Sequence, residues 1–357
     1  MIHKKITKET YIKKKISFWY NNYGRKLPWR VKTQKKLPNP YYIFISEFML
    51  QQTTVNAVVP RFNKFIKIWP NISKLSKINE AKILKFWAGL GYYIRAKNLL
   101  KSVKIISKKY NSIIPIEYDH LIELPGVGDY TAKAILGIAY NKPVMPIDAN
   151  IKRILLRIYG IHQSSKENKP LLQKLASKII SLKNSSNFIQ ALMDFGSIVC
   201  RPKKPNCNEC VINIHCIAYE KKLTNKISIN NKKFLPKLKK FTRAYIILNE
   251  FNEILVRRRP KEGMLQSMIE IPNDKWEKNK TKLIQDKQIK KFSNKLYKCK
   301  KNIVYPFSHF ELNIDIYFTK IKKINVINLK WMSLSRIDNF GMPTVMKKIV
   351  KCYLSSV

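Results

Sequence analysis

The sequence predicts a helical N-terminal half followed by an α+β C-terminal half. Between about residues 11 and 200, apolar residues recur at positions i, i+3, i+4 and i+7, which is the period of an α-helix. Beyond about residue 240, short runs rich in β-branched and aromatic residues alternate partially, and one helical stripe closes the chain. The 357 residues exceed what one core ordinarily organises, so we expect two domains.

The helical prediction depends on five stretches with an apolar stripe. They are ISEFMLQQTTVNAVV (45–59), EAKILKFWAGL (80–90), YYIRAKNLLKSVKIIS (92–107), TAKAILGIAY (131–140) and IKRILLRIYG (151–160). A stripe of this kind lets a helix bury one face against its neighbours. We therefore expect an all-helical domain over residues 1–220.

A basic segment separates this domain from the second one. Residues 221–240 contain an Asn pair and a Pro but no sustained stripe, so we interpret them as a linker. Residues 241–357 then form the α+β domain. Its expected elements are strands over RAYIILNE (243–250), EILVRRR (253–259), NIDIYFT (313–319) and NLKWMSL (328–334), and a helix over TVMKKIVKCYL (344–354).

The net charge of the chain indicates which classes of molecule it can bind. The 70 Lys and Arg against 22 Asp and Glu give a formal net charge of +48, which favours nucleic acid first and acidic membranes second. An AT-rich genome would also raise Lys, Ile and Asn without selection for binding, and that alternative remains open. No stretch approaches the roughly 18 apolar residues of a membrane span, so we expect a cytoplasmic protein without a membrane partner.

Four of the six cysteines lie close together in the sequence. Cys200, Cys207, Cys210 and Cys216 have the spacing C-x6-C-x2-C-x5-C, which brings four soft thiolates onto one loop. Zinc sites more often use two C-x2-C pairs, so the spacing favours a [4Fe-4S] cluster over zinc. Cys299 and Cys352 have no partners at ligand spacing and are expected to be ordinary thiols.

Two of the ten glycines fall together in LPGVGDYTAKAIL, just before a helical run. Gly126 and Gly128 would direct backbone N–H groups at the positive end of a helix dipole toward a phosphate oxygen. An ordinary turn between helices explains such a pair as well. With Leu124-Pro125 before it and Thr131-Ala132 after it, this stretch resembles a helix-hairpin-helix.

The hairpin and the cysteine spacing together resemble the endonuclease III and MutY superfamily of DNA glycosylases. The resemblance is dense from about residue 18 to 217 and implies a [4Fe-4S] loop at 200–216 whose Arg201, Lys203 and Lys204 can meet phosphates. The second domain resembles a Nudix fold without its acidic Mg²⁺ motif, which implies recognition rather than hydrolysis. Two departures are GMLQSMIEIPN, which lacks a tryptophan often found there, and a longer loop after Arg30.

Two carboxylates stand out because acidic residues are scarce. Cleavage of an N-glycosidic bond needs an acid that protonates the departing base and an anion that stabilises the cationic sugar. Glu47 in SEFMLQQT and Asp148 in PIDANIKR lie in apolar surroundings, although a helix glutamate can face solvent and an aspartate can cap a helix. Their stretches resemble the MutY motifs that carry the adenine-protonating glutamate and the cation-stabilising aspartate.

Tyr130 distinguishes the subfamilies. The endonuclease III class carries a lysine at this hairpin position and uses its amine to nick the strand, whereas many MutY proteins carry a tyrosine whose hydroxyl can bond the catalytic carboxylates. The resemblance therefore implies that Tyr130 supports catalysis and that strong lyase activity is absent.

The resemblance also implies residues that read the two bases. The expected adenine pocket consists of Arg25, Trp29, Arg30 and Gln190, although Trp29 can equally be a core aromatic and Gln190 a surface amide. Residues expected to enter the stack around the opposite base are Gln52, Thr53, Leu90 and Tyr92. The expected sensor of 8-oxoguanine is Phe307, Ser308 and His309 in VYPFSHFELNI.

We therefore predict a monofunctional, monomeric adenine DNA glycosylase that acts on adenine paired with 8-oxoguanine or guanine in double-stranded DNA. Its predicted catalytic residues are Glu47, Asp148 and Tyr130. The alternatives are a pyrimidine glycosylase/lyase of the endonuclease III type and a non-catalytic Fe–S protein that binds DNA.

Overall fold

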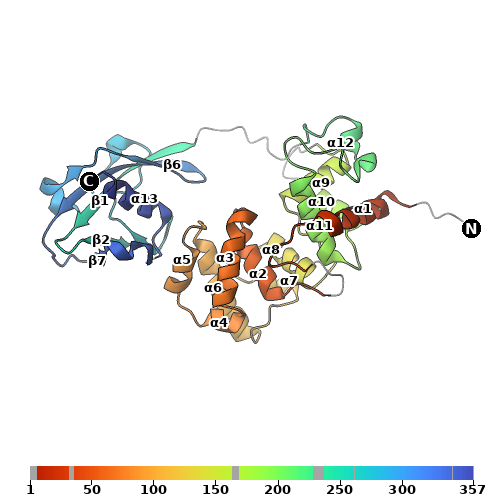
Figure 1. Ribbon diagram of the computed structural model, residues 1–357, viewed down its shortest axis with the longest axis horizontal. Coiled ribbons are helices and arrows are strands. Elements are labelled where there is room, and N and C mark those ends of the chain that lie inside the picture. Colours follow the sequence, from red (N-terminus) through yellow and green to blue (C-terminus); the bar gives the residue numbers. More distant parts are fainter. Residues whose placement is uncertain are drawn as a thin grey trace, which may run out of the picture. The chain divides into compact units, whose positions relative to one another are not determined.

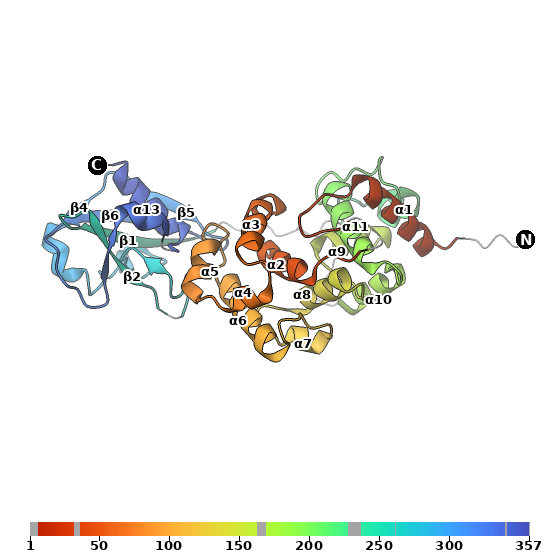
Figure 2. The same cartoon turned by 60° about the horizontal axis from the view of Figure 1, so that its bottom comes forward.

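The chain folds into two compact units, which Figures 1 and 2 show in a computed structural model. The residues described are 6–31, 36–162, 169–227, 237–260, 262–339 and 341–356. The first unit comprises Met1–Lys77 and Asn98–Lys232, and the second comprises Ile78–Lys97 and Lys233–Val357. Helices precede a sheet along the chain, so the predicted fold class is confirmed.

The described N-terminal residues form helices. They are α1 (Lys8–Tyr23), α2 (Pro40–Leu50), α3 (Val55–Ile68), α4 (Ile72–Ser76), α5 (Glu80–Trp87), α6 (Ile94–Lys109), α7 (Tyr118–Ile122), α8 (Asp129–Ala134), α9 (Ala149–Ile158), α10 (Lys169–Ile179), α11 (Ser185–Ile198) and α12 (Ile217–Glu220). Within the first unit, α11 packs against α1 and α9, and α2 packs against α3.

Helix α2 is buried on nearly all sides. Asn39 caps it by accepting a 2.9 Å hydrogen bond from the Tyr41 amide, and Pro40 occupies its first turn, where no N–H is needed. Its sequence PYYIFISEFML is apolar all round, as in helices that lie inside a core. Glu47 is therefore carried on a helix that removes it from water.

Two predicted helices are interrupted. The stretch 45–59 is not one helix, because α2 ends at Leu50 and α3 starts at Val55, with Gln52 at a φ of 55° between them. The polar run from Gln51 to Thr54 offers no apolar side chain to continue the stripe. In the stretch 131–140, α8 is followed by a π-helical turn over Ile135–Ala139.

The structure describes the expected linker, residues 221–240, only at its two ends. Residues 228–236 lie outside the described part of the chain. On one side of them, the Arg157 Nε donates a 3.2 Å hydrogen bond to the carbonyl of buried Ile227. On the other side, β1 already begins at Leu238. Both flanks are therefore part of folded structure.

The described residues of the second unit contain one sheet. Its strands are β1 (Leu238–Leu248), β2 (Glu253–Arg258), β3 (Ile269–Glu270), β4 (Tyr297–Lys298), β5 (Ile303–Pro306), β6 (Phe310–Lys320) and β7 (Lys330–Ser333). The order is β3-β2-β1-β6-β4, with β5 also paired to β6 and β7 to β2. The β1–β6 pair is parallel and the other pairs are antiparallel.

Both faces of the sheet are covered. Ala244 and Ile246 of β1 belong to the core that includes α13 (Thr344–Leu354), whereas Tyr245 and Ile247 pack with Ile289 in a separate cluster. This alternation follows from the two-residue period of a strand. No helix among the described residues is long and apolar enough to cross a membrane.

Candidate functional site

One cavity of the first unit gathers most of the predicted catalytic and adenine-pocket residues. Its volume is about 600 Å³, and α2, α9 and α11 contribute to its wall. The predicted residues that line it are Arg25, Trp29, Arg30, Glu47, Gln52, Tyr130, Asp148 and Gln190. Segments that lie more than 160 residues apart in the sequence therefore meet at one site.

Glu47 is the most strongly shifted carboxylic acid in this cavity. Only 6% of its surface is exposed, and burial raises its pKa from an ordinary 4.5 to about 7. This value includes the nearby charge of Asp148, which also raises the pKa, and a hydrogen bond from Tyr130 and the charge of Arg30, which lower it. A carboxyl group in this environment is partly protonated at neutral pH.

Asp148 is held as an acceptor at the start of α9. Its Oδ1 accepts a 2.7 Å hydrogen bond from the Ile151 amide, and its Oδ2 accepts a 2.9 Å bond from Asn150 Nδ2. Burial raises the pKa of Asp148, whereas these hydrogen bonds oppose that shift because they favour the ionised form. Asp148 is thus both the N-cap of α9 and a member of the cavity.

The charges of both carboxyl groups act on Tyr130. Burial and the charges of Glu47 and Asp148 raise its pKa well above 10, so the phenol stays neutral. Its hydroxyl is hydrogen bonded to Glu47. The cavity wall contains no lysine among the described residues.

Asp194 of α11 organises the two predicted arginines and was not found from the sequence. Its fully buried carboxylate accepts a 2.6 Å bond from Arg25 Nη2 and a 2.7 Å bond from Arg30 Nη1. Burial alone would raise the pKa of Asp194, but the two guanidinium groups hold it below its usual range. A signal was available, because Asp194 follows Gln190 by one helical turn and lies among the apolar residues of α11.

Gln190 presents an unsatisfied acceptor in the cavity wall. The residue is 1% exposed, and its Nε2 donates a 3.0 Å hydrogen bond to the Ser186 carbonyl. Because that carbonyl can only accept, the amide orientation is fixed and Oε1 is left without a partner. Buried acceptors of this kind are rare and costly, so a donor is expected from outside the chain. Trp29, which packs edge-on against Phe62, is buried but also lines the cavity.

Helix α9 joins this cavity to the cysteine loop. Arg153 Nη2 donates a 2.8 Å hydrogen bond to Asn150 Oδ1, and Asn150 in turn binds Asp148. The Nε of the same arginine donates a 2.7 Å bond to the Cys200 carbonyl. One turn later, Arg157 donates to the carbonyls of Arg201 and Pro202.

The four predicted cysteine ligands line a second cavity. Cys200, Cys207, Cys210 and Cys216 share its wall with apolar side chains such as Ile154 and Phe195. Burial raises the pKa of the Cys207, Cys210 and Cys216 thiols, and the neighbouring cysteines raise each pKa as well. Within the described residues, however, no three His, Cys, Asp or Glu side chains converge on a single metal ion.

The glycine-rich turn joins α7 to α8 as a helix-hairpin-helix. Gly126 has a φ of 83°, and a Cβ there would come within 2.8 Å of Asn98 and 2.9 Å of Phe48, so only glycine fits. A Cβ at Gly128 would meet open space. Gln51 Nε2 donates a 3.2 Å hydrogen bond to the Gly126 carbonyl, which connects this turn to the turn that contains Gln52 and Thr53.

The predicted residues of the second unit lie outside both cavities. Tyr92, at a φ of 46°, forms a hydrogen bond with Ser308, although the two are 216 positions apart. Arg95 donates to the carbonyls of Leu90 and Gly91 and thereby holds the turn before Tyr92. Ser308 and His309 are exposed, Phe307 is partly exposed, and Leu90 is 8% exposed.

Glu47→Gln is expected to stabilise the protein at alkaline pH. The folded-state pKa of about 7 lies above the unfolded value of about 4.5, so the cost of ionising buried Glu47 is absent below pH 4.5 and complete above pH 7. The difference corresponds to roughly 3 kcal/mol at most. Urea unfolding at pH 8.5 should show a higher free energy of unfolding for the variant, with little difference at pH 4.5.

The exposed Glu123→Gln variant serves as the matched control. It loses only a solvent-exposed ion pair with Lys109, so its stability should change little at either pH. An equal effect of Glu47→Gln at both pH values would mean that burial of the charge is not what destabilises the wild-type protein.

Two family models match the chain, one in its helical part and one in its sheet-containing part. Residues 45–181 match the family model "HhH-GPD superfamily base excision DNA repair protein", and residues 243–352 match the model of the NUDIX domain. The adenine DNA glycosylase of Buchnera aphidicola subsp. Baizongia pistaciae is 37% identical, over 93% of this chain and 93% of its own length. The Homo sapiens adenine DNA glycosylase is 24% identical, over 94% of this chain and 72% of its own.

Solved structures share the helical fold. A thermostable thymine-DNA glycosylase matches 60% of this chain and 97% of its own, with 29% identity and a TM-score of 0.55. An endonuclease III bound to DNA matches 61% of this chain and 98% of its own, with 20% identity and a TM-score of 0.50. The helical fold, the match to adenine DNA glycosylases along most of the chain and the NUDIX domain all indicate the same family. The chain belongs to the adenine DNA glycosylases, the base excision repair enzymes that hydrolyse the bond between adenine and deoxyribose.

Proposed function

We propose that this enzyme removes adenine paired with 8-oxoguanine or guanine, without strand cleavage of its own, and that Glu47 and Asp148 perform the chemistry. The observation that carries the proposal is the cavity in which these two carboxyl groups have different environments. Glu47 has a pKa of about 7, whereas Asp148 accepts two hydrogen bonds that favour its ionised form. One group is suited to give a proton and the other to stay charged.

The reaction requires one proton transfer and one water. Protonated Glu47 donates to a ring nitrogen of the flipped adenine, and the C1′–N9 bond breaks with its electron pair leaving on the base. The resulting sugar cation is stabilised by the Asp148 carboxylate. Water then adds to C1′, and its proton returns to the Glu47 carboxylate. The neutral Tyr130 hydroxyl holds Glu47 through their hydrogen bond.

Selection of adenine is supported by the unsatisfied Oε1 of Gln190. The exocyclic amine of adenine is a donor that satisfies this atom, whereas guanine presents a carbonyl oxygen at the equivalent position. Trp29 supplies apolar surface to the pocket, and Asp194 fixes Arg25 and Arg30 beside it. A pocket with one buried acceptor rejects a base that leaves it unpaired.

The proposal of a monofunctional enzyme is supported by the side chain at position 130. A lyase forms a covalent imine with the sugar through an amine. Tyr130 has a neutral phenol there, and the described cavity wall contains no lysine.

The remaining predicted residues are proposed to bind the duplex. Gly126 and Gly128 present the hairpin to a backbone phosphate, and Gln52, Thr53, Leu90 and Tyr92 enter the stack around the opposite base. The exposed turn with Ser308 and His309 then contacts that base. Acting on chromosomal DNA, the enzyme is proposed to be a cytoplasmic monomer.

A [4Fe-4S] cluster held by Cys200, Cys207, Cys210 and Cys216 is the proposed cofactor. Four soft thiols around one partly apolar cavity fit it, and their C-x6-C-x2-C-x5-C spacing favours a four-iron cluster over zinc. When bound, the cluster would cross-link this loop. Arg157, which donates to Cys200 Sγ at 3.4 Å and to two loop carbonyls, holds the loop from α9.

Single-turnover excision from duplexes tests the proposal. The substrates contain adenine opposite 8-oxoguanine, guanine or thymine, or contain thymine glycol, and each is assayed with and without alkali. Adenine should be lost only opposite 8-oxoguanine and guanine, with strand breaks only after alkali. Equal loss of adenine opposite thymine would contradict the proposed mispair specificity. Strand breaks without alkali would contradict the proposal of a monofunctional enzyme.

A further inference from the structure

The exposed turn that carries Ser308 and His309 is short and anchored at both ends. The Phe307 amide donates a 2.8 Å hydrogen bond to the Phe310 carbonyl, which leaves Ser308 and His309 as the two central residues between β5 and β6. Their side chains are exposed, while Phe310 is 5% exposed. The direction of the turn therefore depends on the hydrogen bond between Ser308 and Tyr92 and on what fixes the rings at the base of the turn.

Trp276 joins the rings at the base of this turn. Its ring centre lies 5.5 Å from that of Phe307 and 6.1 Å from that of Phe310, and the two phenylalanine rings stack at 4.9 Å. Aromatic rings at these separations attract one another beyond their burial of surface. Trp276 comes from the segment after β3, which is distant in sequence from the turn, so it links two parts of the second unit.

The indole is itself fixed by a buried polar network. Its Nε1 donates a 2.9 Å hydrogen bond to Asn273 Oδ1, and the guanidinium of Arg259 lies 4.7 Å from its ring centre. Asn273 cannot rotate freely, because its Nδ2 donates to Glu270 and to the Ile271 carbonyl at 2.8 Å.

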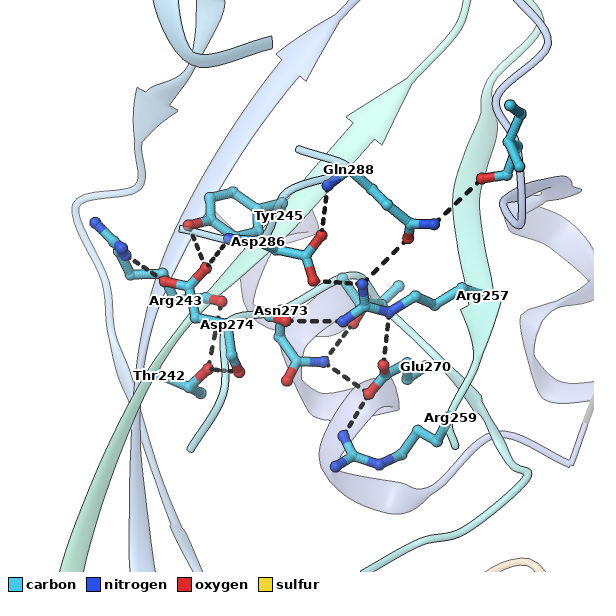
Figure 3. Close-up of polar contacts among 12 residues, drawn as sticks. Thr242, Arg243, Tyr245, Arg257, Arg259, Glu270, Asn273, Asp274, Asp286 and Gln288 are labelled. Carbon is cyan, nitrogen blue, oxygen red and sulfur yellow. Dashed lines mark hydrogen bonds and ion pairs between the residues drawn. The ribbon is translucent and has the colours of Figure 1, made fainter. Parts of the chain in front are cut away.

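Buried Glu270 accepts hydrogen bonds from both Asn273 and Arg259 and so joins them in one network. Figure 3 shows Glu270 between Arg257 and Arg259, with Asn273 beside it. Glu270 is 1% exposed, and a buried carboxylate shared by two arginines and an amide is held in one position. Arg259 also donates a 3.0 Å hydrogen bond to the Met264 carbonyl, which ties the loop before β3 to the same anchor.

We infer that Trp276 is a positioning residue for recognition of the base opposite adenine. The Glu270–Arg259–Asn273 network holds the indole of Trp276 in place, and the indole in turn holds the ring of Phe307. The position of Phe307 then sets where Ser308 and His309 meet the DNA. The inference rests on the proposed function, in which this turn reads the oxidised guanine. Trp276 touches neither reacting atom, so its loss affects the choice of mispair rather than the excision step.

The test compares single-turnover excision of adenine opposite 8-oxoguanine and opposite guanine, at subsaturating enzyme. Trp276→Ala should lower the ratio of the two rates about three- to tenfold, the range that corresponds to one aromatic contact. The rate opposite guanine should stay unchanged. Trp276→Phe keeps a ring against Phe307 and should retain most of the ratio.

Trp331→Ala is the matched control, because Trp331 is a partly buried tryptophan of the same domain that packs with Tyr245 and Leu255 on the other face of the sheet. It should leave the ratio unchanged. If Trp276→Ala does not fold, Trp276→Leu preserves apolar volume without a ring and should show the same loss.

Three outcomes contradict the inference. An unchanged ratio in Trp276→Ala, or equal slowing on both substrates, shows that Trp276 does not position the turn for recognition. An equal fall in Trp331→Ala shows a general effect on the domain. A wild-type enzyme that excises adenine equally opposite 8-oxoguanine and guanine also contradicts the inference, because there is then no preference for Trp276 to set, but it leaves the proposed mispair specificity intact. Only equal excision opposite thymine would overturn that specificity.

Discussion

Glu47→Gln is expected to reduce single-turnover adenine excision by about 10²- to 10⁴-fold, the range by which a positioned general acid accelerates reactions. Glutamine has nearly the same shape but cannot release a proton at any pH of interest, so the base would have to leave as an anion. Burial on α2 should keep the fold intact, because the substitution removes a charge that the interior disfavours.

Excision from a duplex with adenine opposite 8-oxoguanine measures this effect, and gel-shift binding to the same duplex checks that recognition survives. The exposed Glu123→Gln variant should excise at the wild-type rate. A Glu47→Gln enzyme with normal binding and near wild-type excision would exclude Glu47 as the acid.

Asp148→Asn is expected to reduce excision by about 10²- to 10³-fold, the effect of removing one electrostatic partner of a developing charge. Asparagine is as good an N-cap as aspartate, so α9 should remain capped at Ile151. The substitution therefore removes the charge and the bond that Oδ2 accepts from Asn150, because an amide nitrogen in that place cannot accept, but it keeps the helix cap. Asp148→Ala would remove the cap as well.

Thermal unfolding of Asp148→Asn should be close to that of the wild type, and Asp119→Asn, at an exposed position of α7, should be normal in stability and excision. If Asp148→Asn excises normally, a stabilising anion at this position is not needed. If it loses stability in proportion to activity, its effect is structural.

The spacing of apolar residues predicted the fold class because helices and strands each bury one face, and the two faces have different periods in the sequence. The stripe of α9 and the alternation along β1 are both visible in the sequence, and both elements form. The break between α2 and α3 was missed because the apolar residues on its two sides happen to keep helical spacing across the turn. The parallel pairing of β1 with β6 joins residues about 70 positions apart, which local patterns do not encode.

The site was predictable where the resemblance supplied a motif and was not where tertiary contacts create the function. Glu47 and Asp148 were predicted, and the structure adds the burial that gives them different environments. Asp194 was missed because its role depends on Arg25 and Arg30, which lie 169 and 164 positions away. Trp276 was missed for the same reason, since its contact with Phe307 crosses between segments.

The pH dependence of single-turnover excision by the wild-type enzyme tests the central claim most directly. Glu47 must be protonated, so the rate should fall about tenfold per pH unit above its pKa of about 7. Asp148 must be ionised, and because burial raises its pKa, the rate should also fall at the acid end of the profile. A maximum on the acid side of pH 7 is the expected result. A rate that stays constant or rises from pH 6 to pH 9 would contradict the assignment of Glu47 as the acid.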